Sequence, residues 1–321
     1  MSVRRRVGSL ISSTFGAERL DALRRLEARA RHALAVRLEP HRGGKTEAVD
    51  AAGVPAPVQP IEPDRSYEDP QLSRHEFLAG LHRVLEPATY LEIGVNDGRS
   101  LALSRSKSIG VDPMYGILTE IKCDVQLVRD TSDDFFARPD PLEHFEGQSV
   151  DLAFIDGMHW AEFAYRDFSN VERLMSPNGV IVLDDMLPRN ADEASRDRAT
   201  FYWAGDVFKV GEALARLRPD LVVLPVNTSP TGVILVTCLD PSSTVLRDAY
   251  EDLLPELQSA DPQTVPAQVA NRTRAVRAEA ILRSKAMAAL AALDPTGTDR
   301  AEVVRVAAPL RRIRSLGEPG R

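Results

Sequence analysis

The sequence contains few cysteines and no apolar run of membrane-spanning length. Of its 321 residues, only Cys123 and Cys238 are cysteine, which argues against a disulfide framework and against a structural zinc site. No apolar stretch approaches the roughly 18–20 residues that a transmembrane helix needs. The segment after the arginines at positions 4–6 is too short and too polar for a signal peptide. Together these absences predict a cytoplasmic protein.

Positive charge is scarce in the middle of the chain. Lys and Arg outnumber Asp and Glu by eleven to four in residues 1–45 and by eleven to six in residues 261–321. The whole chain has 40 Lys and Arg and 47 Asp and Glu, so the residues between these two ends have 18 basic and 37 acidic side chains. Such an acidic centre repels a phosphate backbone and argues against nucleic acid as a partner. The basic ends are interpreted as solvated helical faces, with contact to a membrane or a partner as the alternative.

Three regions differ in composition. Residues 17–37 repeat leucine and alanine at helical spacing, and a Pro/Gly/Ala-rich segment follows, so residues 1–68 are predicted to form a basic amphipathic helix and a linker. Residues 69–258 carry the strand and helix patterns of one domain, and residues 259–321 form a basic helical C-terminal extension. The N-terminal helix is expected to contact a second copy in a homo-oligomer or to make peripheral contact with a membrane.

Within residues 69–258, seven near-continuous apolar runs alternate with helical stretches. Continuous runs are typical of strands buried on both faces of a parallel sheet. Only "NTSP" separates the last two runs, which indicates an antiparallel hairpin. The pattern therefore predicts an α/β fold, with a doubly wound, mostly parallel seven-stranded sheet and an antiparallel edge hairpin, flanked by helical extensions.

Ligands of open α/β sheets bind beyond the carboxyl ends of the strands, so the residues after each run are the functional candidates. The first run ends in "LEIGVNDGRS", Asp112 follows the second run, and "RDTSDD" follows the third. Asp112 is placed to accept hydrogen bonds from a ribose diol. The candidate cofactor-binding residues are Glu92, Gly94, Asn96, Gly98, Ser100, Asp112, Asp130 and Thr131.

The spacing of the glycines bears on which nucleoside binds. Gly94 and Gly98 form G-x-x-x-G, whereas a dinucleotide fingerprint needs G-x-G-x-x-G to approach a pyrophosphate. Glu92 would also repel a pyrophosphate, so an NAD-dependent enzyme is disfavoured. Together with Asp112 it suits a ligand with a sulfonium, an amino group and a ribose, which favours S-adenosylmethionine. A tight strand-to-helix turn is the alternative explanation of the glycines.

Four stretches carry a family resemblance: "YLEIGVNDGRS", "GVDP", "DLAFIDGMHWAEFAYRDF" and "LMSPNGVIVLDDM". They resemble the class I S-adenosylmethionine-dependent methyltransferases, which have a Rossmann-like fold. In particular, the sequence resembles the metal-dependent O-methyltransferases that act on sugars of macrolides and other bacterial glycosides. The resemblance covers roughly residues 70–240. It departs from the family at Arg129–Thr131, where such proteins often have Gly-Asp-Ser against the adenine.

Three carboxylates follow the fourth and fifth runs: Asp156, Asp184 and Asp185. These strands are expected to be neighbours, so the carboxylates converge and repel one another unless a cation compensates them. All-oxygen ligation suits Mg²⁺ or Mn²⁺, and the resemblance implies the same three ligands. Helix capping and turn formation are the alternative roles for these aspartates.

His159 stands three residues after Asp156. Methyl transfer to a hydroxyl needs a group that accepts the hydroxyl proton, and an imidazole titrates near neutral pH. His159 is therefore predicted to be the catalytic base, beside Asp156, with helix capping as the alternative. The resemblance agrees, since catechol-type methyltransferases have a lysine at the matching place.

Residues 186–206 form a long connection at the predicted ligand face, and such loops are often functional. Tyr202 and Trp203 are candidates to stack on a sugar, and Arg196 or Arg198 to contact a polar acceptor. The alternative is that Trp203 anchors the loop and that Asp206 caps a helix.

Together, the residues and the resemblance predict an S-adenosylmethionine-dependent O-methyltransferase that acts on a sugar or glycoside hydroxyl with a divalent metal. A phenolic or other secondary-metabolite acceptor is the alternative within the same fold. A non-catalytic nucleoside-binding scaffold, which functions through its basic helices, is the alternative from a different class.

Overall fold

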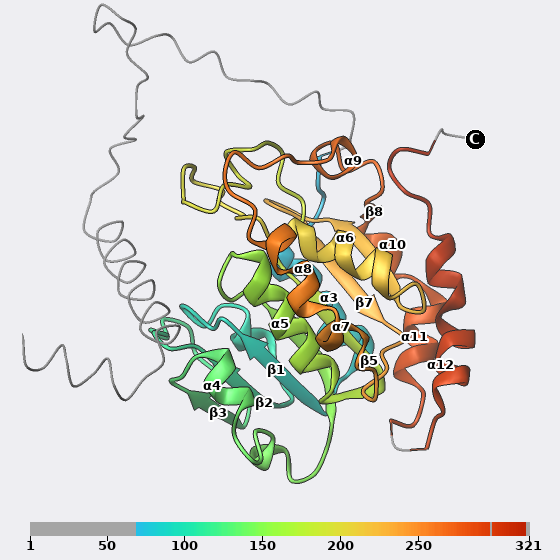
Figure 1. Cartoon of the computed structure of the whole chain (residues 1–321). Coiled ribbons are helices and arrows are strands. Elements are labelled where there is room, and N and C mark those ends of the chain that lie inside the picture. The colour runs from blue at the N-terminus through green and yellow to red at the C-terminus, as the bar shows by residue number, and fades with distance from the viewer. Residues whose placement is uncertain (1–68, 296, 319–321) are drawn as a thin grey trace, which may run out of the picture. The chain divides into compact units, whose positions relative to one another are not determined.

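The computed structural model describes residues 69–295 and 297–318. These residues build an eight-stranded sheet in the order β3-β2-β1-β4-β5-β7-β6-β8 (Figure 1). The predicted N-terminal helix and linker of residues 1–68 lie outside the described residues. No helix in the described part of the chain is long and apolar enough to cross a membrane.

Five strands run parallel, and the order reverses direction between β1 and β4. The strand β7 pairs antiparallel with both β5 and β6, which confirms the predicted α/β class, the parallel sheet and the hairpin. The parallel strands are β1 (Thr89–Ile93), β2 (Lys107–Val111), β3 (Val125–Val128), β4 (Val150–Ile155) and β5 (Met175–Leu183). The hairpin strands are β6 (Val222–Asn227) and β7 (Val233–Thr237).

Helices cover both faces of the sheet, as doubly wound folds require. In Figure 1 the first group lies in front of the sheet and forms one apolar core with it: α5 (Ala161–Glu172), α6 (Phe208–Leu217), α7 (Val245–Asp248) and α8 (Tyr250–Leu257). The second group packs on the other face: α3 (Arg74–Leu85), α10 (Ala278–Leu282), α11 (Lys285–Ala291) and α12 (Arg300–Ala307). Shorter elements are α4 (Ser132–Phe136), α9 (Ala267–Ala270), η1 (Leu101–Leu103), η2 (Glu143–Phe145) and η3 (Ala308–Arg312).

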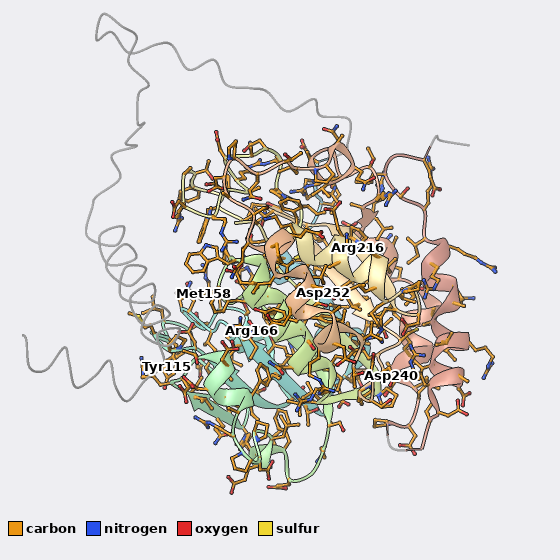
Figure 2. The ribbon with its side chains drawn as sticks, viewed as in Figure 1. Tyr115, Met158, Arg166, Arg216, Asp240 and Asp252 are labelled. Carbon is orange, nitrogen blue, oxygen red and sulfur yellow. The ribbon has the colours of Figure 1, made fainter. Side chains whose placement is uncertain are left out.

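Arg166, which is labelled in Figure 2, links the helices that cover the first face of the sheet. From α5 its Nε donates to Asp133 of α4 over 3.1 Å, and its Nη1 donates to the Tyr250 hydroxyl of α8 over 2.7 Å. Its guanidinium also lies 4.5 Å from the ring centroid of Phe163. The chain after β4 is thereby fixed against both neighbouring segments.

The C-terminal segment is part of the sheet domain in space. Residues 266–293 have a helical composition, but the structure breaks them into α9, a turn, α10 and α11. Within the turn, Arg272 has φ 50° and points inward. The following pair, Val276–Arg277, forms an eighth strand, β8, parallel to β6. This is why the sheet has eight strands and not seven; the boundary at residue 258 stays a prediction.

Alternation along the strands decides which side each candidate residue faces. On β1, Leu91 and Ile93 pack into the α5 core, while Tyr90 packs into the α3 core. Glu92 shares the side of Tyr90 and accepts a hydrogen bond from its hydroxyl. By the same alternation Asp156 and Asp184, which follow β4 and β5, continue on the α3 side.

Candidate active site

The tips of β1 and β4 meet at the point where the strand order reverses, which is where ligands bind in such sheets. The N–H of Asp156 donates to the carbonyl of Ile93 over 2.8 Å. Gly94 has φ +92°, and a Cβ there would lie 1.9 Å from the carbonyl oxygen of Asp156. A side chain cannot fit, so glycine is needed to bring the loop after β1 against the end of β4.

Asp112 is held at the tip of β2 by two backbone groups. Its Oδ2 accepts from the N–H of Asn96 over 2.8 Å, and its Oδ1 accepts from the N–H of Met114 over 2.6 Å. Each carboxylate oxygen has further acceptor capacity. The carboxylate is therefore oriented at the strand tip and is still able to bind a diol.

Glu92 is fully buried at the end of β1. Its Oε2 accepts from the Tyr90 hydroxyl over 2.7 Å, while Oε1 has no hydrogen-bond partner among the described residues. Burial, together with the charges of Asp156 and Asp112, raises the pKa of Glu92 to about 8, although the hydrogen bond from Tyr90 lowers it. An unsatisfied carboxyl oxygen inside the protein is costly, and a ligand that carries positive charge would satisfy it.

The remaining predicted cofactor residues have local partners. Ser100 Oγ lies 3.5 Å from His75 Nε2, and a Cβ on Gly98 would lie 3.0 Å from Ile117. Thr131 caps α4 by accepting from the N–H of Asp134 over 3.1 Å. Asp130 accepts from the Thr131 N–H and from Arg138 at 3.3 Å. Their cofactor contacts stay predictions.

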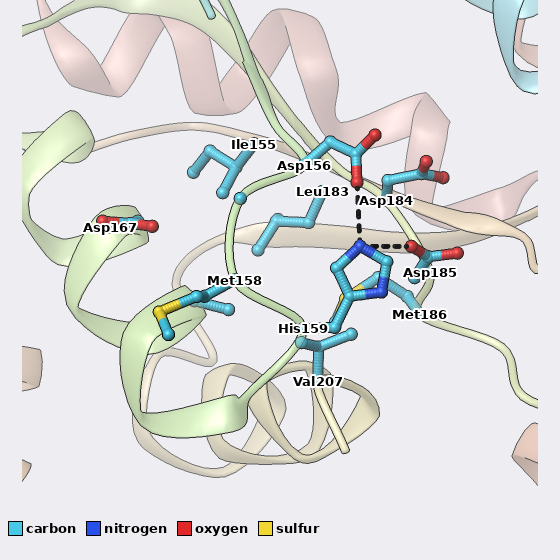
Figure 3. Close-up of a pocket in the computed structure, with 12 residues that line it drawn as sticks. Ile155, Asp156, Met158, His159, Asp167, Leu183, Asp184, Asp185, Met186 and Val207 are labelled. Atoms are coloured by element: carbon cyan, nitrogen blue, oxygen red, sulfur yellow. Dashed lines mark ion pairs between the residues drawn. The ribbon is translucent and has the colours of Figure 1, made fainter. Parts of the chain in front are cut away.

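Asp156, His159 and Asp185 come together beyond β4 and β5. One ligand atom from each lies within 4.8 Å of the others, a spacing that suits a metal ion. Figure 3 shows the imidazole between the two carboxylates. His159 Nε2 is 3.4 Å from Asp156 Oδ1 and 3.2 Å from Asp185 Oδ2.

Asp185 is both buried and strained. Its φ of 62° lies in the left-handed region, which costs a non-glycine residue about 1–3 kcal/mol. Its Oδ1 accepts from the Thr231 hydroxyl, while Oδ2 has no hydrogen-bond donor among the described residues. Burial, and then the charge of Asp156, raise the pKa of Asp185 to about 7. A cation beside Oδ2 would stabilise the ionised carboxylate.

Asp184 faces a different partner. Arg74, the first residue of α3, donates to Asp184 Oδ2, and its Nη1 lies 3.6 Å from Asp156 Oδ2. Asp184 Oδ1 is buried with no hydrogen-bond partner in the described part of the chain. Burial and the adjacent Asp185 raise the pKa of Asp184. The structure thus brings all three predicted aspartates to one edge and places the guanidinium of Arg74 against two of them, Asp184 and Asp156.

The loop of residues 186–206 holds His159 in place. His159 Nδ1 lies 3.0 Å from the carbonyl oxygen of Trp203, and because a carbonyl only accepts, the proton is assigned to Nδ1. The two rings stack with centroids 4.7 Å apart. Gly205 has φ +66°, and a Cβ there would lie 1.8 Å from the carbonyl oxygen of His159. The loop can approach this closely because residue 205 is glycine.

Asp206 and Arg196 are structural residues of this loop. Asp206 Oδ1 accepts from the N–H of Ala161 over 2.8 Å and so caps α5, which has no cap of its own. Arg196 pairs with Glu162 and with Asp206, each over 2.7 Å. Asp206 thus caps a helix, as the alternative interpretation of the loop predicted. The helix that it caps is α5, and not α6, which follows Asp206 in the chain.

The other acceptor candidates lie differently. Trp203 Nε1 donates to the carbonyl of Ser195 over 2.6 Å. The ring of Trp203 therefore anchors the loop and also packs against His159. Arg198 donates to the carbonyls of Thr200 and Phe201. Tyr202 is 45% exposed, with the Arg189 guanidinium 5.3 Å from its ring centroid. Among these residues Tyr202 presents a ring to solvent.

A cavity of about 10 Å³ lies next to the cluster and is also lined by apolar side chains such as Ile155, Leu183 and Val207. Its volume is the space of about one water molecule. Asp156, His159, Asp184 and Asp185 line it, together with Asp167 of α5 (Figure 3). Burial raises the pKa of Asp167 to about 7. The cavity can hold an ion or a water, so an organic acceptor has to bind outside it.

Sequence reasoning missed Arg74 and Thr231. Arg74 follows Ser73, which forms a capping box with Glu76. The sequence pattern therefore predicts that Arg74 lies at the start of a helix. The sequence does not predict that this helix start contacts the carboxylates of Asp156 and Asp184. Thr231 lies in the turn between β6 and β7 and reaches Asp185 only because β7 pairs with β5.

A comparison with known protein families matches the segment of the chain that contains this site. Residues 91–186, under a third of the chain, match a family model described as a methyltransferase domain. The matched segment spans the end of β1, Asp112, Asp156, His159, Asp184 and Asp185. No curated protein matches the chain.

Solved structures of methyltransferases are similar at low levels. The methyltransferase PaMTH1 of Podospora anserina, bound to SAH, is 17% identical with a TM-score of 0.38, over 51% of this chain and 77% of that one. The O-methyltransferase TomG of Streptomyces achromogenes, involved in tomaymycin synthesis and in complex with SAM, is 19% identical with a TM-score of 0.36, over 51% and 78%. An O-methyltransferase of Bacillus cereus in complex with SAH is 16% identical with a TM-score of 0.38, over 51% and 80%. Values this low do not establish a shared activity.

Proposed function

We propose that the protein is an S-adenosylmethionine-dependent methyltransferase that methylates a hydroxyl with the help of a divalent metal. The observation that carries the proposal is the convergence of two sets of groups at one sheet edge. Asp112 and Glu92 stand at the tips of β2 and β1, and Asp156, His159 and Asp185 stand at the tips of β4 and β5. The methyltransferase-domain match over residues 91–186 supports the same reading.

The residues present fit the cofactor. Glu92 Oε1 is buried and lacks a hydrogen-bond partner among the described residues, as a site for a cationic ligand requires. Asp112 is oriented by Asn96 and Met114 and retains acceptor capacity for a ribose diol. When bound, S-adenosylmethionine supplies an activated methyl group, so the work left for this chain is to orient the acceptor and to remove its proton.

The residues also fit a divalent cation. Asp185 Oδ2 is buried without a hydrogen-bond donor in the described region and lies beside Asp156 and His159. Carboxylate oxygens suit Mg²⁺ or Mn²⁺, and a bound cation of this kind supplies Lewis acidity toward a hydroxyl. Asp156 and Asp185 would hold it.

His159 is proposed as the base. Its Nδ1–H faces the carbonyl of Trp203, so Nε2, which points to the carboxylates, is the nitrogen that would take the proton of an acceptor hydroxyl. Asp156 at 3.4 Å and Asp185 at 3.2 Å would stabilise the imidazolium that forms when Nε2 takes the proton. A positioned base contributes roughly 10²–10⁴-fold.

A sugar or glycoside is proposed as the acceptor. The family resemblance supports it, and the half-exposed ring of Tyr202 offers an apolar face next to Arg189. A phenolic acceptor would use the same edge of the sheet. The two acceptors differ in the hydroxyl, which ionises more readily in a phenol.

Product analysis tests the proposal. The full-length protein is incubated with methyl-labelled S-adenosylmethionine and Mg²⁺, and a glycoside panel is compared with a catechol panel by mass spectrometry. We expect label in a glycoside, loss of transfer on chelation of the metal, and calorimetric binding of S-adenosylhomocysteine that is lost in D112A. Absence of S-adenosylhomocysteine binding would contradict the proposed function, and label confined to catechols would contradict the acceptor.

A further inference from the structure

Arg74 is a cation within the candidate metal site that the sequence motifs do not include. It begins α3, where Ser73 and Glu76 form a capping box that fixes the first turn. Its backbone N–H donates to the carbonyl of Ser229 over 3.0 Å. The main chain is therefore held from two sides, and the guanidinium has a defined origin.

The guanidinium is divided between two of the three aspartates. It donates to Asp184 Oδ2 and lies 3.6 Å from Asp156 Oδ2. The side chain of Asp184 is 1% exposed and that of Arg74 is 23% exposed. A hydrogen-bonded pair this buried is strongly coupled, because either charge alone would be costly to keep out of water.

The alternation of the strand explains why Asp184 and Asp185 have different partners. Asp184 continues β5 on the side of α3 and meets Arg74, whereas Asp185, at φ 62°, turns toward Thr231 and His159. The ligand atoms within 4.8 Å of one another come from Asp156, His159 and Asp185. Asp184 and Asp185 are adjacent in sequence, but because the backbone turns at Asp185 their side chains face different partners.

The charges also balance in this arrangement. Three ionised carboxylates are neutralised by one guanidinium and one divalent cation, with no need for every carboxylate to touch the metal. Arg74 balances the charge of Asp184 at Oδ2, while Asp184 Oδ1 has no hydrogen-bond partner in the described region. Two carboxylates are left for the cation, which is a usual number for Mg²⁺.

We propose that Arg74 binds Asp184 and withholds it from the divalent cation, so that Asp156 and Asp185 are the carboxylate ligands. This rests on the proposed metal-assisted function and sharpens its ligand set. Arg74 and Asp184 then act as a positioning pair, which docks the start of α3 on the metal edge and tempers the affinity for the cation.

Mn²⁺ binding by variants of the pair tests the proposal. Bound and unbound Mn²⁺ are counted by electron paramagnetic resonance on the full-length protein, without substrate. D156N and D185N should each weaken Mn²⁺ binding about tenfold or more, as loss of a ligand or its support does. R74M should tighten it about fivefold or more, since a nearby positive charge is removed and a carboxylate is released.

The decisive variant is R74M/D184N, which removes both charges of the pair, so that neither is left without its partner. We expect its Mn²⁺ affinity within about threefold of the wild type, because neutral exchange of a pair costs little. R74K is the matched control and should also stay within about threefold, since the positive charge is kept. Thermal unfolding confirms that each variant is folded.

Binding by R74M/D184N as weak as that of D185N would overturn the inference and make Asp184 a ligand. In that outcome the proposed methyl transfer stands, because S-adenosylhomocysteine binding and labelled product are measured separately. A wild-type protein that binds no Mn²⁺ would overturn the inference together with the role of the metal.

Discussion

Trp203 lies flat against the imidazole of His159, with ring centroids 4.7 Å apart and planes inclined by 15°. Its carbonyl oxygen also faces His159 Nδ1 at 3.0 Å. One residue therefore fixes both the plane of the imidazole and the nitrogen that carries its proton. Trp203 itself is held by the hydrogen bond from its Nε1 to the carbonyl of Ser195. The loop of residues 186–206 therefore positions the proposed base.

Truncation of Trp203 should impair catalysis more than binding. We expect W203A to lower kcat about tenfold or more, because a displacement of the base by 1 Å costs up to about 10²-fold, while S-adenosylhomocysteine affinity changes less than about twofold. W203F, which keeps the stacked ring, should lose less. The neighbouring F201A is the control, since Phe201 is 77% exposed; equal losses in W203A and F201A would show that the stacking does no positioning.

Replacement of His159 separates its two chemical roles. As the base, H159Q should reduce methyl transfer by roughly 10²–10⁴-fold, while Mn²⁺ affinity stays within about threefold of the wild type. The reason is that glutamine cannot take a proton at neutral pH but disturbs the carboxylates little. Single-turnover rates and Mn²⁺ titration measure the two effects. Mn²⁺ binding weakened tenfold would instead assign Nε2 to the cation.

Much of the fold was predictable because it depends on local pattern. Continuous apolar runs predicted the strands, and the short "NTSP" connection predicted the β6–β7 hairpin that the structure contains. Parallel strands place their carboxyl ends at one edge, so the convergence of Asp156, Asp184 and Asp185 at that edge followed from the order of the runs.

What sequence could not supply are contacts between segments far apart in the chain. Arg74 meets Asp184 across 110 residues, and Thr231 meets Asp185 across 46. Asp206 was readable as a cap, but the helix that it caps begins 45 residues earlier at Ala161. The helical composition after residue 266 also concealed the turn at Arg272, because partners elsewhere in the chain outweigh helix propensity there.

The cap on α5 should be a large contribution to stability. Asp206 is fully buried, accepts from Ala161 and pairs with Arg196 and Lys209. Removal of one partner from such a network costs about 3–5 kcal/mol, so D206A should lower the free energy of unfolding by that amount in urea. E256Q is the control: Glu256 pairs with Arg216 at an exposed site, where about 0–1 kcal/mol is expected. Equal effects would contradict the structural role of Asp206.

Arg272 should fasten the C-terminal segment to the turn that carries Thr231. It is buried and donates to Asn227 Oδ1 over 2.8 Å and to the carbonyls of Thr228 and Pro230 over 3.0 and 2.5 Å. We expect R272M to lower the free energy of unfolding by about 3 kcal/mol or more, since several buried acceptors lose their donor.

The matched variants for Arg272 are R272K and R274M. R272K should recover part of the loss, because lysine keeps the charge but not the planar fork. R274M should change little, since Arg274 is exposed. Hydrogen exchange of the β6–β7 turn gives a second measurement, and protection there that is unchanged in R272M would contradict the fastening.

The last prediction concerns the pH dependence of stability through Glu92. Its pKa is raised by burial to about 8 in the folded protein, against 4.5 as its ordinary value. The folded state therefore binds its proton more tightly than the unfolded state does. The stabilisation is complete below about pH 4.5 and is lost as the pH rises through about 8.

In E92Q this contribution is absent, so its free energy of unfolding should fall less steeply between pH 5 and pH 8.5, by about 2–4 kcal/mol over the window. Urea unfolding across this range measures the slope, with E143Q at an exposed position as control. Parallel slopes for E92Q and the wild type would mean that Glu92 is ionised in the folded protein at neutral pH, with a cation already beside its buried oxygen.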